Sequence, residues 1–391
     1  MTQPVSPRTR VMIVGGGTAG HVLPGVAIGR ELVEQGMAPE EIHFVGSERG
    51  VEHKLVPEAG FELTLLPGRG IARRLTKDNV GAVIGLAKAF VTSSSLLRSM
   101  NPEVVVALGG YASVPAGLQA VLGRTPIVVA EQNAVPGLAN KIIGRFAKAS
   151  AVSYEGTDLP RATWTGNPVR PAILDVVDNY DSRRAEARQR FGIRADQHHV
   201  VVFGGSLGAR TINNATVGAL ESLRDRDDIV IRHIIGHRDY DDVVSAVEAN
   251  GTAGPRYVPI EYEDDMASVY ASADLVVCRA GATSCAELAV TNTPAVLIPL
   301  PGAPGDHQTA NGRALERVGG AEVLADSVFD AELMVQTIDR LVQDPEILAS
   351  MREGAAQAAR PDASAAVVEV IRPFLDGPIN LDEPTNEESA S

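Results

Sequence analysis

The chain contains one pattern twice: a short apolar run, a glycine-rich turn and then a segment long enough for a helix. The first copy reads VMIVGGGTAG from Val11, and the second reads VVVFGGSLGA from Val200. A buried strand that enters a helix through a glycine turn brings the backbone close to whatever the turn contacts. Because each copy opens one half of the chain, the repeat predicts two domains of the same kind.

Short apolar runs alternate with helix-length segments along both halves. The runs expected to form buried strands are 11–14, 42–45, 104–108 and 127–130, then 200–203, 229–235, 275–278 and 295–299. Unbroken Val, Ile and Leu is typical of parallel strands that helices cover on both faces. The sequence therefore predicts an α/β protein with two Rossmann-like, doubly wound parallel-sheet domains and an interdomain cleft.

The length of 391 residues also favours two domains. We expect an N-terminal domain over 8–170 and a C-terminal domain over 171–373, with its last helix free to pack back on the N-terminal domain. The segment 168–189, with Pro171 and an Arg- and Ala-rich helix, is expected to be the linker region. Residues 374–391 have little to bury, so we expect a disordered acidic tail there.

The formal net charge is −14, so the field of the whole protein repels nucleic acid and anionic membrane, and any anion site has to be built locally. The N-terminus is polar and unlike a signal peptide, and no apolar run approaches the roughly 18 residues of a spanning helix. Cys278 and Cys285 lack the spacing of a metal or redox pair. These features predict a cytoplasmic protein with no nucleic-acid partner.

Three glycine turns follow predicted strands, at 15–20, 109–113 and 204–208. The first fits G-x-G-x-x-G, and the N–H groups at the start of its helix would face an anion such as phosphate. A dinucleotide enzyme should also carry an acid at the end of its second strand, but that strand ends at Ser47 with Glu48 past the turn. An NAD(P) or FAD oxidoreductase is therefore the less favoured alternative.

Several longer motifs occur in a fixed order: GGTAGHVLP from Gly16, GGYASVP from Gly109, EQN from Glu131 with GLANK from Gly137, GNPVR from Gly166, GGSLGAR from Gly204, CRAG from Cys278 with Glu287, and DHQ from Asp306 with Asn311. Together they resemble the MurG family of peptidoglycan N-acetylglucosaminyltransferases over about 11–373. Two positions depart from the family pattern. Ala19 replaces a usual glycine, and Ala130 replaces a frequent histidine, so Ala130 is assigned no role.

The resemblance implies a GT-B fold and an inverting hexosyltransferase of peptidoglycan synthesis, which links it to cell wall biogenesis, cell shape and cell division. Such an enzyme moves GlcNAc from UDP-GlcNAc to undecaprenyl-diphospho-MurNAc-pentapeptide (lipid I), forming lipid II at the cytoplasmic face of the cell membrane without a cofactor. An anionic membrane surface and cell-wall synthesis proteins are candidate partners. Alternatives are another GT-B enzyme, such as a UDP-GlcNAc 2-epimerase with extra active-site acids, and a non-catalytic nucleotide sensor.

His21 follows the first glycine turn and is the candidate catalytic base, because an imidazole titrates near neutral pH. Glu131 remains a rival base or an orienting partner. Arg170 and Ser206 offer hydrogen-bond donors to the departing diphosphate. The resemblance implies further contacts: Thr18, Ala19, Gly20 and Asn133 with the donor sugar or on the acceptor side, Gln308 with the GlcNAc hydroxyls, Glu287 with the ribose, and Tyr111 on the acceptor side.

No metal is expected. Asp225 with Asp227 and Asp239 with Asp241 have D-x-D spacing, but both pairs lie in charged, loop-like stretches that predict a solvated surface.

Residues 69–98 hold six basic residues and one acid among apolar residues, and Lys141, Arg145 and Lys148 extend this set. The bases and apolar side chains predict peripheral docking on an anionic membrane. A crossover helix with a basic outer face is the alternative, and a lipid-linked acceptor favours docking.

Overall fold

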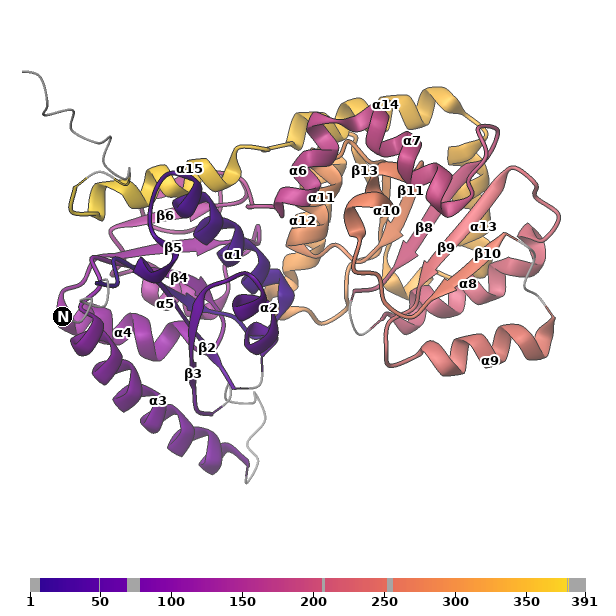
Figure 1. Ribbon diagram of the computed structural model, residues 1–391. Helices are drawn as coiled ribbons and strands as arrows, with labels where there is room; N and C mark the ends of the chain where they lie inside the picture. The colour runs from indigo at the N-terminus through magenta and orange to yellow at the C-terminus, as the bar shows by residue number, and fades with distance from the viewer. Residues whose placement is uncertain are drawn as a thin grey trace, which may run out of the picture. The chain divides into compact units, whose positions relative to one another are not determined.

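The computed structural model describes residues 8–48, 50–68, 78–205, 208–251, 256–377 and 379. Contacts divide the chain into two compact units. The first comprises Met1–Gln132, Pro136–Pro168 and Asp362–Ser391, and the second comprises Asn133–Val135 and Val169–Pro361. Each unit is one parallel β-sheet with helices on both faces (Figure 1).

The first unit has a seven-stranded sheet in the order β3-β2-β1-β4-β5-β6-β7. Its strands are β1 (Val11–Gly15), β2 (Ile42–Ser47), β3 (Glu62–Leu66), β4 (Val104–Gly109), β5 (Ile127–Glu131), β6 (Ala149–Val152) and β7 (Ala162–Trp164). Its helices are α1 (Ala19–Glu34), η1 (Pro39–Glu41), α2 (Glu52–Glu58), α3 (Asp78–Met100), α4 (Ser113–Gly123), α5 (Leu138–Gly144), α15 (Ala363–Ile371) and η4 (Arg372–Phe374).

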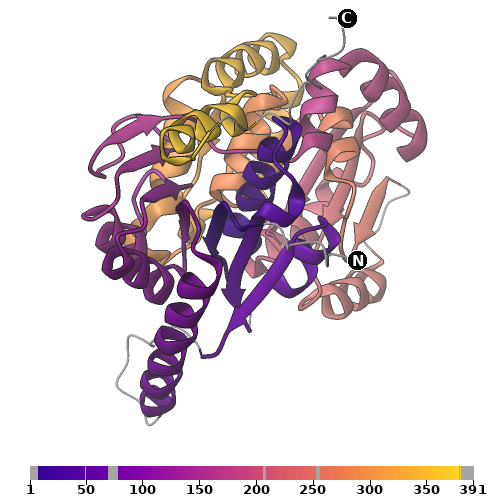
Figure 2. The ribbon, with the colours of Figure 1, turned by 60° about the vertical axis from the view of Figure 1, so that its left-hand side comes forward.

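Successive residues of β1 enter different helical layers, as the two-residue period of a strand requires. Val11 and Ile13 pack in the core cluster that contains residues of α1, α2 and α15. Met12 and Val14 pack with residues of α3, α4 and α5. Figure 2 shows α3, the long purple helix, extending beyond the sheet that it covers. The unbroken apolar run of β1 is thus explained by two buried faces.

The second unit has a six-stranded sheet in the order β10-β9-β8-β11-β12-β13. Its strands are β8 (His198–Phe203), β9 (Ile229–Ile234), β10 (Tyr257–Ile260), β11 (Leu275–Cys278), β12 (Ala295–Leu297) and β13 (Ala321–Val323). Its helices are α6 (Pro171–Asp178), α7 (Tyr180–Phe191), α8 (Arg210–Leu223), α9 (Tyr240–Asn250), α10 (Met266–Ser272), α11 (Ala282–Val290), η2 (Pro304–Asp306), α12 (His307–Arg317), η3 (Asp326–Val328), α13 (Ala331–Val342) and α14 (Pro345–Ala358).

The same alternation builds the second core. Val200 and Val202 of β8 pack with residues of α8, α9, α13 and α14. Val201 and Phe203 pack with residues of α6, α10, α11 and α12. The predicted architecture of two doubly wound parallel sheets is confirmed.

The eight predicted strands correspond to four consecutive strands in each sheet. In the first sheet they are β2, β1, β4 and β5, and in the second β9, β8, β11 and β12. Of the five strands that the sequence missed, β3, β7, β10 and β13 are the edge strands of the two sheets, and β6 lies next to the edge strand β7. Edge strands are less fully covered, so their sequences mix polar with apolar residues; β7, for example, is exposed along its length.

The predicted domain limits left the last helix free to pack back on the N-terminal domain. Residues 362–373 group with the first unit, because Val367, Val368 and Ile371 of α15 are buried in its core. The predicted linker region is mostly part of the second unit, where Arg184 and Arg188 of α7 both pair with Asp274. The C-terminal tail beyond 379 lies outside the described residues.

Candidate functional site

The first candidate site lies where the strand order of the first sheet reverses. From β1 the chain continues to β2 on one side, whereas β4 pairs with β1 on the other. In open α/β sheets, ligands bind at the carboxyl ends of the strands at such a reversal. The turns that follow β1 and β4, at Gly15–Gly17 and Gly109–Gly110, therefore form the candidate site of this unit.

These two turns are in direct contact. The Gly16 N–H donates to the Gly109 carbonyl at 3.2 Å. A Cβ on Gly110, whose φ is +80°, would lie 2.3 Å from the Gly16 carbonyl oxygen. Gly17 differs, because an added Cβ there would meet no atom within 4 Å. Gly110 is thus needed for packing between the turns, while the turn at Gly17 opens toward space that a ligand could occupy.

His21 lies in the first turn of α1 and packs on the second glycine turn. Its Nδ1 is 3.0 Å from the Thr18 hydroxyl oxygen, and Thr18 is the residue before α1. A Cβ on Gly109 would be 3.4 Å from His21 Nε2. Ala19 and Gly20 are partly buried residues of the same turn. The structure therefore brings Thr18, Ala19, Gly20 and His21 together at the strand reversal.

Glu131 ends β5 and is almost completely buried, with 3% of its surface exposed. Its Oε2 accepts hydrogen bonds from Asn140 Nδ2 at 2.9 Å and from the Gly137 N–H at 3.0 Å. Asn140 Nδ2 would also lie 3.2 Å from a Cβ on Gly109. These contacts order the segment between β5 and α5 beside the second glycine turn.

Tyr111 follows the second glycine turn, and its hydroxyl donates to the Pro67 carbonyl at 3.0 Å. Burial raises the pKa of the Tyr111 phenol, and the Glu48 carboxylate raises it further. The residue is therefore a neutral hydrogen-bonding group at physiological pH. It joins the end of β3 to the turn after β4.

The second unit has its own strand reversal, between β8 and β11. Gly204 and Gly205 follow β8, and Gly205 and Gly208 have φ angles of +98° and +77°. A Cβ on Gly208 would lie 2.1 Å from the Ile235 carbonyl oxygen, so this glycine is required for packing. Ser206, the predicted donor to the diphosphate, lies outside the described residues.

Arg170 and Glu287 form an ion pair within this unit. Glu287 Oε1 accepts from Arg170 Nε at 2.9 Å and lies 2.8 Å from Arg170 Nη2. Glu287 Oε2 accepts from the Tyr270 hydroxyl at 3.0 Å. Only 4% of the Glu287 side chain is exposed, compared with 28% of the Arg170 side chain.

Burial raises the pKa of the Glu287 carboxyl, while Arg170 acts in the opposite direction. Both carboxylate oxygens of Glu287 accept from protein donors, one from Arg170 and the other from Tyr270. The Arg170 guanidinium is the more accessible member of the ion pair. The sequence missed Tyr270, because the only signal for it is a tyrosine at the start of an apolar stretch.

Asn133 belongs to a short segment that groups with the second unit, although β5 and α5 on either side belong to the first. Asn311 of α12 holds this segment and is fully buried. Its Oδ1 accepts from the Ala134 N–H at 2.8 Å, and its Nδ2 donates to Asn133 Oδ1 and to the Ala280 carbonyl, each at 3.2 Å. Asn311 therefore fixes the position of Asn133.

Gln308 lies one turn earlier on α12 and is partly buried. Its Oε1 accepts from the Leu300 N–H at 2.9 Å, which fixes the plane of its side-chain amide. The loop after β12 and the start of α12 are thereby held together. Gln308 is oriented by the backbone of its own unit.

Comparison with known proteins assigns each unit to a domain of one glycosyltransferase family. The model of the glycosyltransferase family 28 N-terminal domain matches residues 11–152, and that of the C-terminal domain matches residues 199–367. A relative from Myxococcus xanthus, named UDP-N-acetylglucosamine--N-acetylmuramyl-(pentapeptide) pyrophosphoryl-undecaprenol N-acetylglucosamine transferase, is 39% identical over 92% of each chain. A relative of the same name from Caldanaerobacter subterraneus is 35% identical over 93% of this chain and 99% of its own.

The crystal structure of Acinetobacter baumannii MurG superposes with a TM-score of 0.72 at 28% identity, covering 94% of this chain and all of that one. The chain belongs to the MurG family. A UDP-N-acetylglucosamine 2-epimerase structure from Listeria monocytogenes reaches a TM-score of 0.65 at 13% identity, which shows a shared fold alone. The expected MurG resemblance, GT-B fold and glycosyltransferase class are thus confirmed.

The D-x-D pairs of this MurG family member differ in their surroundings. Asp239 is buried and pairs with Arg238 and Arg210, so the prediction of a solvated position was wrong for this residue. Its two arginines lower the pKa of its carboxyl. Asp227 is largely exposed and pairs with Arg256. Within the described part of the chain, no cluster of three histidine, cysteine or acidic side chains could hold a metal ion.

Proposed function

We propose that this chain transfers GlcNAc from UDP-GlcNAc to undecaprenyl-diphospho-MurNAc-pentapeptide (lipid I), which gives lipid II. The observation that carries the proposal is the set of curated relatives with one transferase name, at 33–39% identity over more than nine-tenths of this chain. Strand reversals in both units, each with its own glycine turns, support a donor site on one unit and an acceptor site on the other.

The donor site is proposed on the second unit, with Arg170, Ser206, Glu287, Gln308 and Asn133. Before Glu287 can bind the ribose hydroxyls, its carboxylate has to give up the hydrogen bonds from Arg170. It then accepts hydrogen bonds from the nucleotide instead. We propose this exchange, because it also releases the partly exposed guanidinium toward the diphosphate, where two parallel N–H groups bind oxygen well. Tyr270 keeps its bond to the other carboxylate oxygen and holds Glu287 in place during the exchange.

His21 is proposed as the general base. If its Nδ1–H donates to the Thr18 hydroxyl, 3.0 Å away, then Nε2 is the basic nitrogen. The acceptor hydroxyl attacks the anomeric carbon of GlcNAc while its proton passes to His21. The bond from that carbon to the UDP oxygen breaks, and UDP leaves with the electron pair, stabilised by Arg170 and by N–H groups of the glycine turns. Tyr111, beside the second turn, is proposed on the acceptor side.

Membrane docking is proposed through the helical layer of α3, α4 and α5. No helix in the described ranges is long and apolar enough to cross a membrane. Segments 85–100, 113–124 and 138–148 carry six cations and no acid, in a chain of net charge −14. Large apolar side chains are exposed in the same layer: Val91 by 72%, Leu122 by 72%, Leu138 by 75% and Phe146 by 52%.

Cations around exposed apolar side chains suit reversible docking on an anionic leaflet. A lipid-linked acceptor would require such docking at the cytoplasmic face of the membrane. The basic segment 69–77, part of the predicted patch, lies outside the described residues.

A thermal-shift titration tests the donor assignment. UDP and UDP-GlcNAc should each raise the midpoint of thermal unfolding in a saturable manner, since a ligand that binds only the folded state stabilises it. NADH and FAD at the same concentrations should leave the midpoint unchanged. Stabilisation by NADH without stabilisation by UDP would favour an oxidoreductase and refute the proposal.

A further inference from the structure

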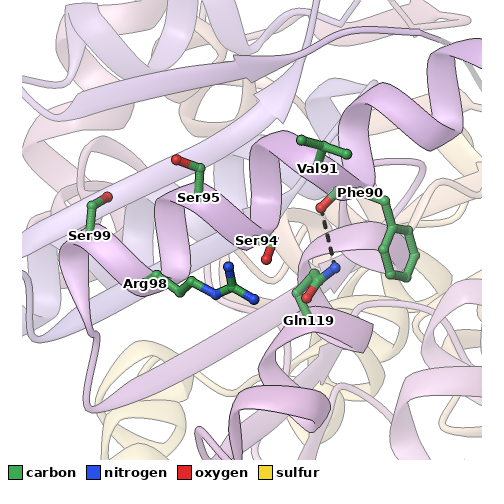
Figure 3. Close-up of a pocket in the computed structure, with 7 residues that line it drawn as sticks. All are labelled: Phe90, Val91, Ser94, Ser95, Arg98, Ser99 and Gln119. Carbon is green, nitrogen blue, oxygen red and sulfur yellow. Dashed lines mark hydrogen bonds between the residues drawn. The ribbon is translucent and has the colours of Figure 1, made fainter.

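Two polar clusters lie outside the candidate sites. One lines the groove between α3 and α4 and belongs to the layer that is proposed to dock on the membrane (Figure 3). The other lies inside the second unit and comprises His233 of β9, Asn213 of the first turn of α8 and Tyr257 of β10. This second cluster ends at the glycine turn after β8, which is part of the proposed donor site.

Asn213 connects the cluster to the glycine turn. Its Nδ2 donates to the Ile235 carbonyl at 3.2 Å and lies 3.4 Å from Asp239 Oδ2. A Cβ on Gly208 would lie 2.1 Å from the same carbonyl oxygen and 3.4 Å from Asn213 Nδ2. The Gly208 N–H donates to the Gly205 carbonyl at 2.9 Å and closes the turn. Asn213 thus holds the carbonyl on which the last glycine of the turn packs.

His233 holds the Asn213 amide in this orientation. Because a carbonyl oxygen only accepts, Asn213 has to face Ile235 with its N–H group, and its Oδ1 therefore faces the other way. Oδ1 lies 3.1 Å from His233 Nε2, so Nε2 carries the hydrogen. Burial lowers the pKa of His233 to about 3, so the ring is neutral, and its Nδ1 accepts from the Tyr257 hydroxyl at 2.9 Å. One tautomer of His233 satisfies the whole cluster.

Water cannot easily replace a lost member of this cluster. His233 is fully buried, and only 1% of Asn213 is exposed. Loss of the Nε2–H group would take away the donor to Asn213 Oδ1 in a place that solvent does not reach, and a buried acceptor without its donor is costly. The amide could then turn and release the Ile235 carbonyl.

We propose that His233 is a positioning residue for the nucleotide, because through Asn213 it keeps the Ile235 carbonyl against Gly208. The proposal rests on the proposed donor site of the second unit. N–H groups at a glycine turn bind a diphosphate well only where the backbone holds them in place, so loss of the bond from His233 weakens UDP binding. Tyr257 contacts the opposite nitrogen of the ring, and loss of its hydroxyl leaves the bond to Asn213 in place.

Two amide substitutions separate the roles of the two ring nitrogens. In His233→Gln the amide nitrogen reaches the place of Nε2 and can donate to Asn213, whereas in His233→Asn it reaches only the place of Nδ1. Isothermal titration calorimetry of the full-length chain with UDP measures affinity, and thermal unfolding measures stability. Both variants should unfold at a lower temperature than wild type. His233→Asn should bind UDP at least fivefold more weakly, and His233→Gln should stay within twofold of wild type.

Asn213→Ala removes the intermediate amide and leaves a residue that favours the helix. It should weaken UDP binding at least fivefold, and His233→Asn added to it should weaken binding no further, because the two residues act in series. Equal UDP affinity of His233→Asn and His233→Gln, or wild-type affinity of Asn213→Ala, would show that the cluster only stabilises the core. If the wild type binds no UDP, the proposed donor site is itself refuted.

Discussion

Removal of the Tyr270 hydroxyl tests whether the orientation of Glu287 matters for donor binding. Tyr270→Phe deletes the donor to Glu287 Oε2, at 3.0 Å, and leaves a ring of the same shape in the core. Glu287 is 3% exposed, so water cannot replace the lost donor without local opening. A hydrogen bond to a buried charged group contributes about 1.5–3 kcal/mol to the free energy of unfolding.

For a unit of this size, that loss corresponds to a decrease of about 3–12 °C in the midpoint of thermal unfolding. The affinity for UDP-GlcNAc, measured by isothermal titration calorimetry, should fall at least fivefold, or about 1 kcal/mol. The reason is that the carboxylate would no longer be held where the ribose meets it.

Tyr257→Phe is the matched control. It also removes a tyrosine hydroxyl of the second unit, from a partly buried residue whose oxygen lies 2.9 Å from His233 Nδ1, and it leaves Glu287 unchanged. This variant should be destabilised while its donor affinity stays within about twofold of wild type. If Tyr270→Phe loses stability but binds UDP-GlcNAc as Tyr257→Phe does, Tyr270 has only a structural role and our reasoning is refuted.

Three further predictions concern the base, the buried histidines and the glycine turns. His21→Ala should lower kcat about 100-fold or more with UDP affinity intact, and near-normal turnover would remove His21 from the base role. Burial lowers the pKa of His199 to about 4 and that of His233 to about 3, so each stays neutral in the folded chain while the unfolded chain takes up a proton below about pH 6.5. Denaturant titrations should therefore show the free energy of unfolding falling by about 2 kcal/mol per histidine from pH 7 to 5, and a flat profile would contradict the assignment. Gly110→Ala should destabilise the first unit by about 2 kcal/mol or more. Gly60→Ala should cost less, because Gly60 has a similar φ of +87° but an added Cβ there would meet no atom within 4 Å. Equal losses of stability would show that the contact with Gly16 is unimportant.

The sequence predicted the centre of each sheet better than its edges. A central strand such as β1 is buried on both faces, and its apolar run is visible in the sequence alone. β7 is exposed, and β10 is only partly buried, so neither leaves a comparable signal. The placement of α15 depends on apolar side chains that any amphipathic helix could carry, and only the folded core determines which unit buries them.

In the candidate sites, too, the sequence predicted the features that a local pattern encodes and missed the contacts that depend on tertiary packing. The strand–turn–helix pattern located the glycine turns and His21, because backbone geometry restricts which residues can occupy them. The bond between Arg170 and Glu287 joins residues 117 positions apart, and no local pattern encodes such a pair. The contact of Glu287 with Tyr270 and the contacts of Asn311 with the segment around Asn133 depend likewise on tertiary packing. Which of these residues touch substrate stays a prediction.

Release of UDP from UDP-GlcNAc, measured with and without lipid I, tests the central claim most directly. The account predicts that UDP appears only when the lipid acceptor is present, in amounts equal to the lipid II formed. Binding of UDP-GlcNAc with no UDP release in the presence of lipid I would contradict it, as would conversion of UDP-GlcNAc to its C2 epimer without an acceptor.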